Sequence, residues 1–326
     1  MFCPENFEEI FDLDENIFYN DNIIIPICDN RKTLQVLFID RIMKILGIKK
    51  PHRLFPPKPS DGLKNLHKSV IETNGSDHYK LSVFYYVLLE FDQVTKTCES
   101  SKALVQKSFL PKKYQTLVKG LWHMDHQEFE IALQYLAHPS LIPSFPDEII
   151  EVLCRASNDD PTLPIAYYYS AQPSLSNQKT IDYLLSQLAK SSVTEAFYFT
   201  RTRNEYCQQQ TFELLIKLVL SQTPSGVIAD RCIELINLPL TPQEEKWFEE
   251  YLLLGDGKTL SGAKDILMMR SVGTGKFKEF LSLEFLSLKN SKKEIVNGMN
   301  WNLISNAVRT GLGPRLSTEK MNDSKQ

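Results

Sequence analysis

The sequence predicts an all-α protein, an irregular solenoid of stacked antiparallel helix pairs. Apolar residues recur at helical spacing in nearly every long segment of its 326 residues. Alternating runs bounded by hairpin turns, which would indicate strands, do not occur apart from the short NIIIPI at 22–27. The expected connections are short, which favours antiparallel neighbours, and stacked helix pairs build a solenoid. No fixed repeat period is present, so the solenoid is expected to be irregular.

The first strong helical patterns lie at residues 33–46 and 78–92. The first is strongly apolar and ends at Gly47, a residue type that often closes a helix. The second is apolar on most of its faces. A helix without a polar face is expected to be buried.

Two further helices, 114–125 and 126–137, are expected on either side of Asp125. The Asp125 carboxylate can cap the second helix, because aspartate is a preferred N-cap residue. Glu128, three positions on, suits the return contact of a capping box.

Residues 138–150, HPSLIPSFPDEII, interrupt the helices with three prolines. Proline lacks an amide donor and cannot continue a helix, so the preceding helix is expected to end near His138. A flexible linker would be polar or rich in glycine and serine, whereas this segment carries large apolar residues. We therefore predict a rigid, packed corner whose apolar side chains lie against neighbouring helices. These side chains are Leu141, Ile142 and Phe145.

The second half of the chain continues the helical pattern, and its clearest helix begins after Thr241. Thr241 is a good N-cap, Pro242 takes the first helical position, and Glu244 can complete a capping box. Gly255 can end the helix, and Trp247 is the expected buried anchor. Further helices are predicted at 146–157, 178–190, 194–203, 209–222 and 227–238.

Composition indicates an intracellular protein. The net charge of −3 gives no overall attraction to nucleic acid. The six cysteines form no C-x-x-C pair, which is typical of reduced thiols in the cytosol or nucleus. No signal peptide is expected, and no run of 18 apolar residues could span a membrane. The cysteines are Cys3, Cys28, Cys98, Cys154, Cys207 and Cys232.

Charge divides the chain into three expected regions: an acidic N-terminal segment at 1–22, a helical domain at 23–288 and a basic, flexible tail at 289–326. Aromatic residues are spaced among the acids of the first segment. This segment is expected either to bind a partner or to pack as the first helix of the body, and the sequence does not decide between them. Its aromatic residues are Phe2, Phe7, Phe11, Phe18 and Tyr19.

The motif HMDH at 123–126 is the nearest approach to a metal site. It places His123, Asp125 and His126 together, but zinc needs further ligands at matching spacing. Only His138 is near along the chain. We therefore expect structural histidines and no metal.

The motif SVGTGKFK at 271–278 resembles a phosphate-binding loop in part. A P-loop requires glycine where Arg270 stands, and Ser or Thr where Phe277 stands. The residues before it read as a helix and not as a buried strand. We expect a turn between helices, with no nucleotide or other cofactor, and no catalytic residues anywhere in the chain.

Two aromatic runs, Tyr167–Tyr168–Tyr169 and Phe197–Tyr198–Phe199, could stack on nucleic-acid bases. They lack interleaved basic residues and lie in helical segments. Packing into the core is therefore the expected role.

Five long segments resemble the ELYS family of nuclear pore proteins. They occur in the family's order within residues 5–285: 54–70, 120–153, 191–201, 231–253 and 260–270. The resemblance implies an α-helical, solenoid-like domain and a structural role instead of catalysis. It also implies a place in the nuclear envelope, at the short-arm end of the Y-shaped outer-ring subcomplex of the pore. Its partners would be other nucleoporins, and its role would extend to nucleocytoplasmic transport, including mRNA export.

The resemblance also sets limits. Animal members of the family carry an N-terminal β-propeller and C-terminal AT-hooks that bind chromatin. Here the nearest segment, GLGPRLS at 311–317, lacks the R-G-R-P core, so DNA binding is not expected and the chain resembles a short, fungal-type member. A free α-solenoid adaptor in RNA export or vesicle coats is the alternative function. The resemblance assigns no partner-binding residues.

Overall fold

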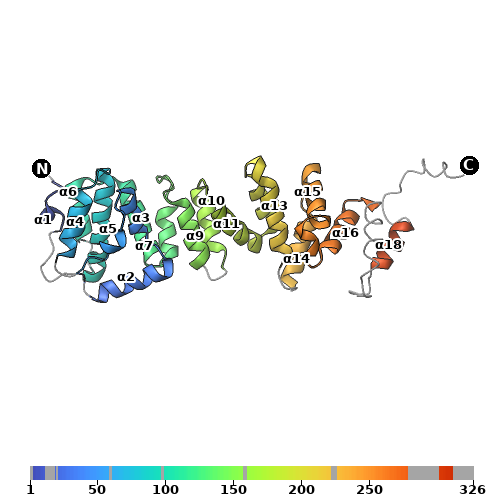
Figure 1. Cartoon of the computed structure of the whole chain (residues 1–326), viewed down its shortest axis with the longest axis horizontal. Coiled ribbons are helices and arrows are strands. Elements are labelled where there is room, and N and C mark those ends of the chain that lie inside the picture. Colours follow the sequence, from blue (N-terminus) through green and yellow to red (C-terminus); the bar gives the residue numbers. More distant parts are fainter. Residues whose placement is uncertain are drawn as a thin grey trace, which may run out of the picture. The chain divides into compact units, whose positions relative to one another are not determined.

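The structure, a computed structural model, describes residues 3–11, 19, 21–58, 61–96, 99–156, 160–221, 226–277 and 301–310. Within these ranges all regular secondary structure is helical (Figure 1). The helices group into two compact units, Met1–Thr180 and Ile181–Gln326. Within each unit, many helices that follow one another in the chain pack together. The predicted all-α, solenoid-like fold is confirmed.

The first unit contains ten α-helices among its described residues. Helix α5 is the centre of this unit, because it contacts α3, α4, α6 and α7 (Figure 1). It is buried along most of its length, as its apolar faces predict. The helices are α1 (Phe7–Ile10), α2 (Asp21–Leu34), α3 (Phe38–Ile45), α4 (Gly62–Ile71), α5 (Asp77–Thr95), α6 (Glu99–Ser108), α7 (Lys112–Asp125), α8 (Phe129–Leu136), α9 (Pro146–Ala156) and α10 (Thr162–Ala171).

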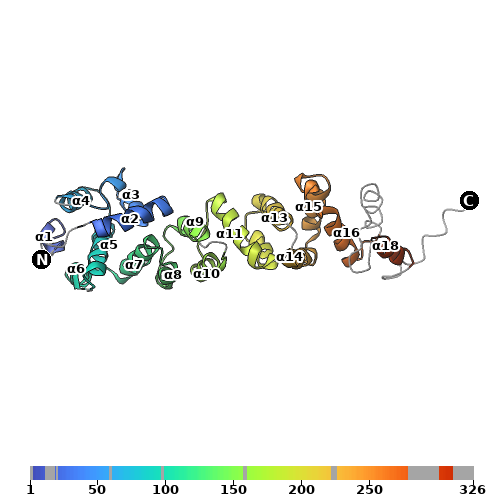
Figure 2. The same cartoon turned by 90° about the horizontal axis from the view of Figure 1, so that it is seen from below.

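The second unit is built around α13, which packs on α12, α14 and α15, while α16 packs on α14 and α15 (Figure 2). Its described helices are α11 (Gln178–Ser191), whose first residues precede the division, α12 (Val193–Arg201), α13 (Glu205–Leu220), α14 (Gly226–Ile236), α15 (Pro242–Leu253), α16 (Ala263–Gly273) and α18 (Trp301–Arg309). Two short 3₁₀ helices, η1 (Pro51–Arg53) and η2 (Asp256–Thr259), complete the described elements.

Several helices begin on a carboxylate that belongs to a different helix. Asp92 of α5 accepts the N–H groups of Ser100 and Ser101 at the start of α6, both at 3.1 Å. Glu234 of α14 accepts the N–H groups of Val193 and Thr194 at the start of α12, at 2.9 and 3.2 Å. The first N–H groups of a helix have no partner within it, and a negative charge there is favourable. These contacts therefore stabilise a helix start and hold two helices in register.

The predicted helix at 33–46 is divided in the structure. Helix α2 ends at Leu34, Gln35 takes a left-handed conformation with φ of 66°, and α3 begins at Phe38. The segment NIIIPI is part of α2, so its hint of a strand was wrong. Helices α4, α6, α10 and α18, and residues 21–32 of α2, were not predicted from the sequence.

The capping box at Thr241 is confirmed. The Thr241 hydroxyl accepts the N–H of Glu244, and the Glu244 carboxylate accepts the N–H of Thr241 at 2.7 Å. The prediction that Trp247 is the buried anchor of α15 was wrong, because its side chain is only partly buried. The buried anchor is instead Phe248, which is fully buried and packs near Phe212 of α13, with ring centroids 6.3 Å apart.

The proline-rich corner lies inside the first unit and is packed on one side only. Phe145, at a φ of 58°, places its ring 6.4 Å from that of Phe38. Ile142 is 83% exposed, so the expectation that it packs on a neighbouring helix was wrong. The division between the two units falls at Thr180 and not at this corner. The three predicted regions, 1–22, 23–288 and 289–326, remain a prediction.

Candidate functional site

The acid in HMDH caps a helix, but not the one expected. Asp125 ends α7, and its carboxylate accepts the N–H of Phe38 at 2.7 Å, the N–H of Ile39 at 3.1 Å and the hydroxyl of Tyr86 at 2.8 Å. It therefore caps α3, while α8 begins at Phe129 without a side-chain cap. Burial raises the pKa of Asp125 to about 7, although these three hydrogen bonds and nearby His126 lower it.

Both histidines of the motif bind groups of their own chain. Nδ1 of His123 lies 2.6 Å from Oε2 of Glu128, and its ring stacks on that of Tyr135. Nδ1 of His126 donates to the Trp122 carbonyl at 2.8 Å, and Nε2 lies 3.4 Å from Oε2 of Glu90. Burial alone lowers the pKa of His126, but Glu90, the Trp122 carbonyl and Asp125 together raise it to about 9.

The fourth candidate ligand, His138, is engaged elsewhere, since its Nδ1 accepts the N–H of Ser140 at 3.1 Å. Across the residues that the structure describes, no three His, Cys, Asp or Glu side chains come together in a way that could hold a metal ion.

We predict that the first unit loses stability as the pH rises from 6.5 to 9. A histidine whose pKa is higher in the folded chain stabilises it fully below its unfolded pKa of 6.5. That contribution is lost as the pH passes through the folded value of about 9. The loss amounts to at most about 3 kcal/mol. Urea unfolding at several pH values measures it.

The variant His126→Gln provides the control, because glutamine keeps a hydrogen-bonding side chain but does not titrate in this range. Between about pH 8 and 9 the wild-type protein should lose stability more steeply than the variant, although the loss of His126 also raises the pKa of Asp125 in the variant. Equal slopes for the two proteins would contradict the assignment of the charge to His126.

The motif SVGTGKFK ends helix α16, as expected. The N–H of Lys276 donates to the Ser271 carbonyl at 2.8 Å, and the N–H of Gly275 donates to the Val272 carbonyl at 3.2 Å. With Gly275 at a φ of 75°, this is a Schellman motif, a common helix ending. The Lys276 ammonium lies 3.0 Å from Oε1 of Glu249. The features that resemble a P-loop therefore end helix α16, and the second helix of the predicted helix-to-helix turn lies outside the described residues.

The two aromatic runs are only partly in the core. Tyr167, Phe197 and Phe199 are buried, but Tyr169 and Tyr198 are half exposed, so the core assignment was wrong for these two. Basic residues also lie nearby. The guanidinium of Arg201 sits 4.3 Å from the centre of the Phe197 ring, and that of Arg203 sits 4.5 Å from the centre of the Phe199 ring.

The described part of the acidic N-terminal segment packs on the body of the first unit. Phe11 and Tyr19 are buried, and the Phe7 ring meets His67 edge-on at 5.6 Å. Nε2 of His67 lies 2.9 Å from the Pro4 carbonyl oxygen. Of the two alternatives, packing on the body holds for these residues. Phe2 and Phe18 lie outside the described residues.

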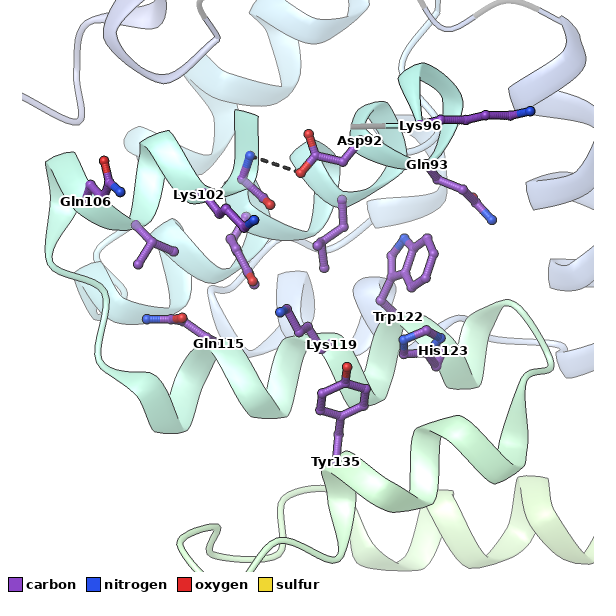
Figure 3. A pocket seen from close by; sticks show the side chains of 14 residues that line it. Asp92, Gln93, Lys96, Lys102, Gln106, Gln115, Lys119, Trp122, His123 and Tyr135 are labelled. Carbon is purple, nitrogen blue, oxygen red and sulfur yellow. Dashed lines mark hydrogen bonds between the residues drawn. The ribbon is translucent and has the colours of Figure 1, made fainter. Parts of the chain in front are cut away.

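A groove of about 640 Å³ opens between α5, α6, α7 and α8 (Figure 3). Its walls carry the apolar side chains of Leu89 and Val105 beside the largely buried ring of Trp122. Three lysines line it, one from each of three helices, and Figure 3 shows that Lys102 and Lys119 point toward the groove whereas Lys96 extends away from it. They are Lys96 at the end of α5, Lys102 of α6 and Lys119 of α7.

The sequence gives no sign of this groove. The three lysines stand at irregular spacing along the chain and give no run of positive charge. Their common location depends on the packing of α6 and α7 on α5. The amphipathic pattern of α7 indicates only that one face is polar, not which helix lies opposite it.

No described helix combines the length and the apolar character needed to cross a membrane. The family model described as "ELYS: Nuclear pore complex assembly" matches residues 36–255, which run from α3 to α15. A Schizosaccharomyces pombe protein named "Uncharacterized protein ely5" is 32% identical over 246 residues, which cover 74% of this chain and 77% of the yeast protein. The helical fold, the five segments that occur in the family's order, and both matches agree: the chain belongs to the ELYS family of nuclear pore complex assembly proteins.

Proposed function

We propose that this protein is a structural subunit of the nuclear pore complex. In this proposal it joins other nucleoporins at the short-arm end of the Y-shaped outer-ring subcomplex. There it supports pore assembly and nucleocytoplasmic transport, including mRNA export. The match to the ELYS family carries the proposal, because it extends over residues 36–255 and includes helices of both units.

The roles of the polar side chains support a scaffold function instead of catalysis. Asp125, His126 and Lys276 are the groups that catalytic or nucleotide-binding chemistry would need. Each of them bonds to a helix start, a carbonyl or a carboxylate of its own chain. Side chains engaged in this way stabilise helix packing, which a scaffold subunit requires.

A fluorescently tagged copy, expressed from its own promoter in the cells of origin, tests the proposal. A stable punctate rim at the nuclear envelope is expected, together with co-purification of outer-ring nucleoporins. A diffuse or vesicular signal would instead indicate a free adaptor. A rim signal without outer-ring nucleoporins would place the protein elsewhere in the pore.

We predict that Lys276→Ala leaves this rim localisation unchanged. The substitution removes a partly exposed ion pair with Glu249, and such pairs contribute only about 0–1 kcal/mol. Quantitative imaging of the rim, with immunoblots for expression level, measures the outcome. Loss of the rim at normal expression and normal thermal stability would show that the GTGK turn has a function of its own.

A further inference from the structure

We propose that the groove between α5, α6, α7 and α8 binds an acidic peptide segment of a neighbouring protein, with an apolar side chain of that segment seated between the lysines. This inference deepens the proposed function, on which it rests for the origin of the peptide. Three features of the groove suit such a peptide: its charge, its apolar walls and its hydrogen-bonding groups (Figure 3).

The charge around the groove is positive on balance, because three lysines and one acid line it. Within the described part of the chain, the ammonium groups of Lys96, Lys102 and Lys119 have no ion-pair partner. The lining acid, Asp92, is 5% exposed and already accepts the N–H groups of Ser100 and Ser101. A carboxylate that enters the groove therefore meets the ammonium groups of Lys102 and Lys119, whereas Lys96 extends away from the groove (Figure 3).

The apolar part of the groove lies between these cations. Leu89 and Val105 are partly exposed, and the Trp122 ring beside them is 8% exposed. Burying apolar surface contributes about 25 cal/mol per Å². A leucine, isoleucine or phenylalanine side chain flanked by acids would complement both features.

Two amides suit the backbone of a peptide. Gln93 follows Asp92 on α5, and Gln106 lies on α6 (Figure 3). Neither side chain makes a hydrogen bond within the described residues. An amide side chain can donate to a carbonyl and accept from an N–H, which matches the repeating groups of an extended peptide.

The lining disfavours nucleic acid as the occupant. It includes no arginine, the residue type best suited to bind phosphates through two parallel hydrogen bonds. Its largest ring, Trp122, is almost fully buried and already packs against His126 at 4.1 Å between ring centres. Single-stranded nucleic acid binds by stacking bases on accessible rings, and Trp122, at 8% exposed, offers little surface for stacking.

The test is fluorescence anisotropy with the purified full-length chain. The probe is a fluorescein-labelled peptide of alternating glutamate and leucine. Three comparison probes have lysine in place of glutamate, serine in place of leucine, and an oligothymidine of similar length. We expect the glutamate–leucine peptide to bind most tightly, the serine version more weakly, and the other two to show no saturable binding.

The variant Lys102→Glu/Lys119→Glu should weaken binding of the acidic peptide roughly tenfold, since it removes two ion pairs and adds repulsion. The matched control is Lys107→Glu/Lys112→Glu, which makes the same charge change on α6 and α7 outside this groove. It should bind nearly as the wild type does. Lys102→Gln/Lys119→Gln checks the result without added negative charge, and thermal melts check folding.

Equal weakening in both charge-reversal variants would overturn the proposal, because it would indicate a general electrostatic attraction. Saturable binding of the oligothymidine in preference to the peptide would overturn it in favour of nucleic acid. These measurements do not depend on localisation. A protein that forms the rim but ignores the peptide would refute the groove alone, and one that binds the peptide but misses the rim would refute the pore assignment.

Discussion

Replacing Asp125 by alanine is expected to destabilise the first unit by about 3–5 kcal/mol, since each buried group left without its hydrogen bond costs about 1–3 kcal/mol. The carboxylate is 2% exposed and serves the N–H groups of Phe38 and Ile39 and the hydroxyl of Tyr86. Its removal leaves all three donors buried and unpaired. It also removes the negative charge at the start of α3.

Urea unfolding followed by Trp122 fluorescence measures this effect. Replacing Trp247 and Trp301 by phenylalanine makes Trp122 the reporter of the first unit, because it is then the only tryptophan in the chain. The control is Asp147→Ala, which removes a surface carboxylate that accepts the N–H groups of Ser176 and Asn177 before α11. That change should cost about 1 kcal/mol. Equal costs for the two variants would refute the role assigned to Asp125.

Replacing Arg270 by methionine is expected to destabilise the second unit by about 3–5 kcal/mol, the cost of breaking a buried ion pair. Arg270 is 5% exposed, and its Nε lies 3.1 Å from Oε2 of Glu245. Its other nitrogens donate to the carbonyls of Ile236 and Leu238. Methionine fills similar space, so the effect comes from the lost donors and from Glu245, which keeps only Lys276, at 4.0 Å, as an ion-pair partner.

Trp247 fluorescence, with Trp122 and Trp301 replaced by phenylalanine, follows the second unit. The control Lys246→Met removes an exposed pair with Glu250 on the same helix and should cost no more than about 1 kcal/mol. The double variant Arg270→Met/Glu245→Gln should recover part of the loss, because it no longer leaves a largely buried carboxylate without its main partner. No recovery would show that the two carbonyls, and not Glu245, determine the cost.

The Arg270 contacts explain why the corner between α14 and α15 keeps its shape. Arg201 holds the same corner from α12, with its guanidinium bonded to Glu244 at 2.7 and 2.9 Å and to the Pro239 carbonyl at 2.9 Å. Burial raises the pKa of Glu244, but Arg201 and Thr241 outweigh it and lower that pKa overall. The sequence shows the cap at Thr241, yet it gives no sign that Arg201 and Arg270 secure the corner between α14 and α15.

In the proline-rich corner, too, the sequence predicts one part of the structure and the fold decides the other. Prolines and the acidic start of α9 indicate where one helix ends and the next begins, and the structure places α8 and α9 on either side. Which apolar side chain packs was not predictable. Phe145 meets Phe38 of α3, whereas Ile142 faces solvent, because only the fold decides which side of the corner another helix covers.

The sequence by itself determined the helical class, most helix positions and the capping box at Thr241, because these depend on neighbours within about one helical turn. It also determined the family, because five long segments resemble the family and occur in its order. Only the tertiary structure decided that Asp125 caps α3, whose Phe38 lies 87 residues away in the sequence. It also decided that Arg270 secures the α14–α15 corner and that three lysines line one groove. Local spacing sets which side chains share a helix face. It carries no information on which distant helix that face will meet, and the partners of buried charges depend on that choice.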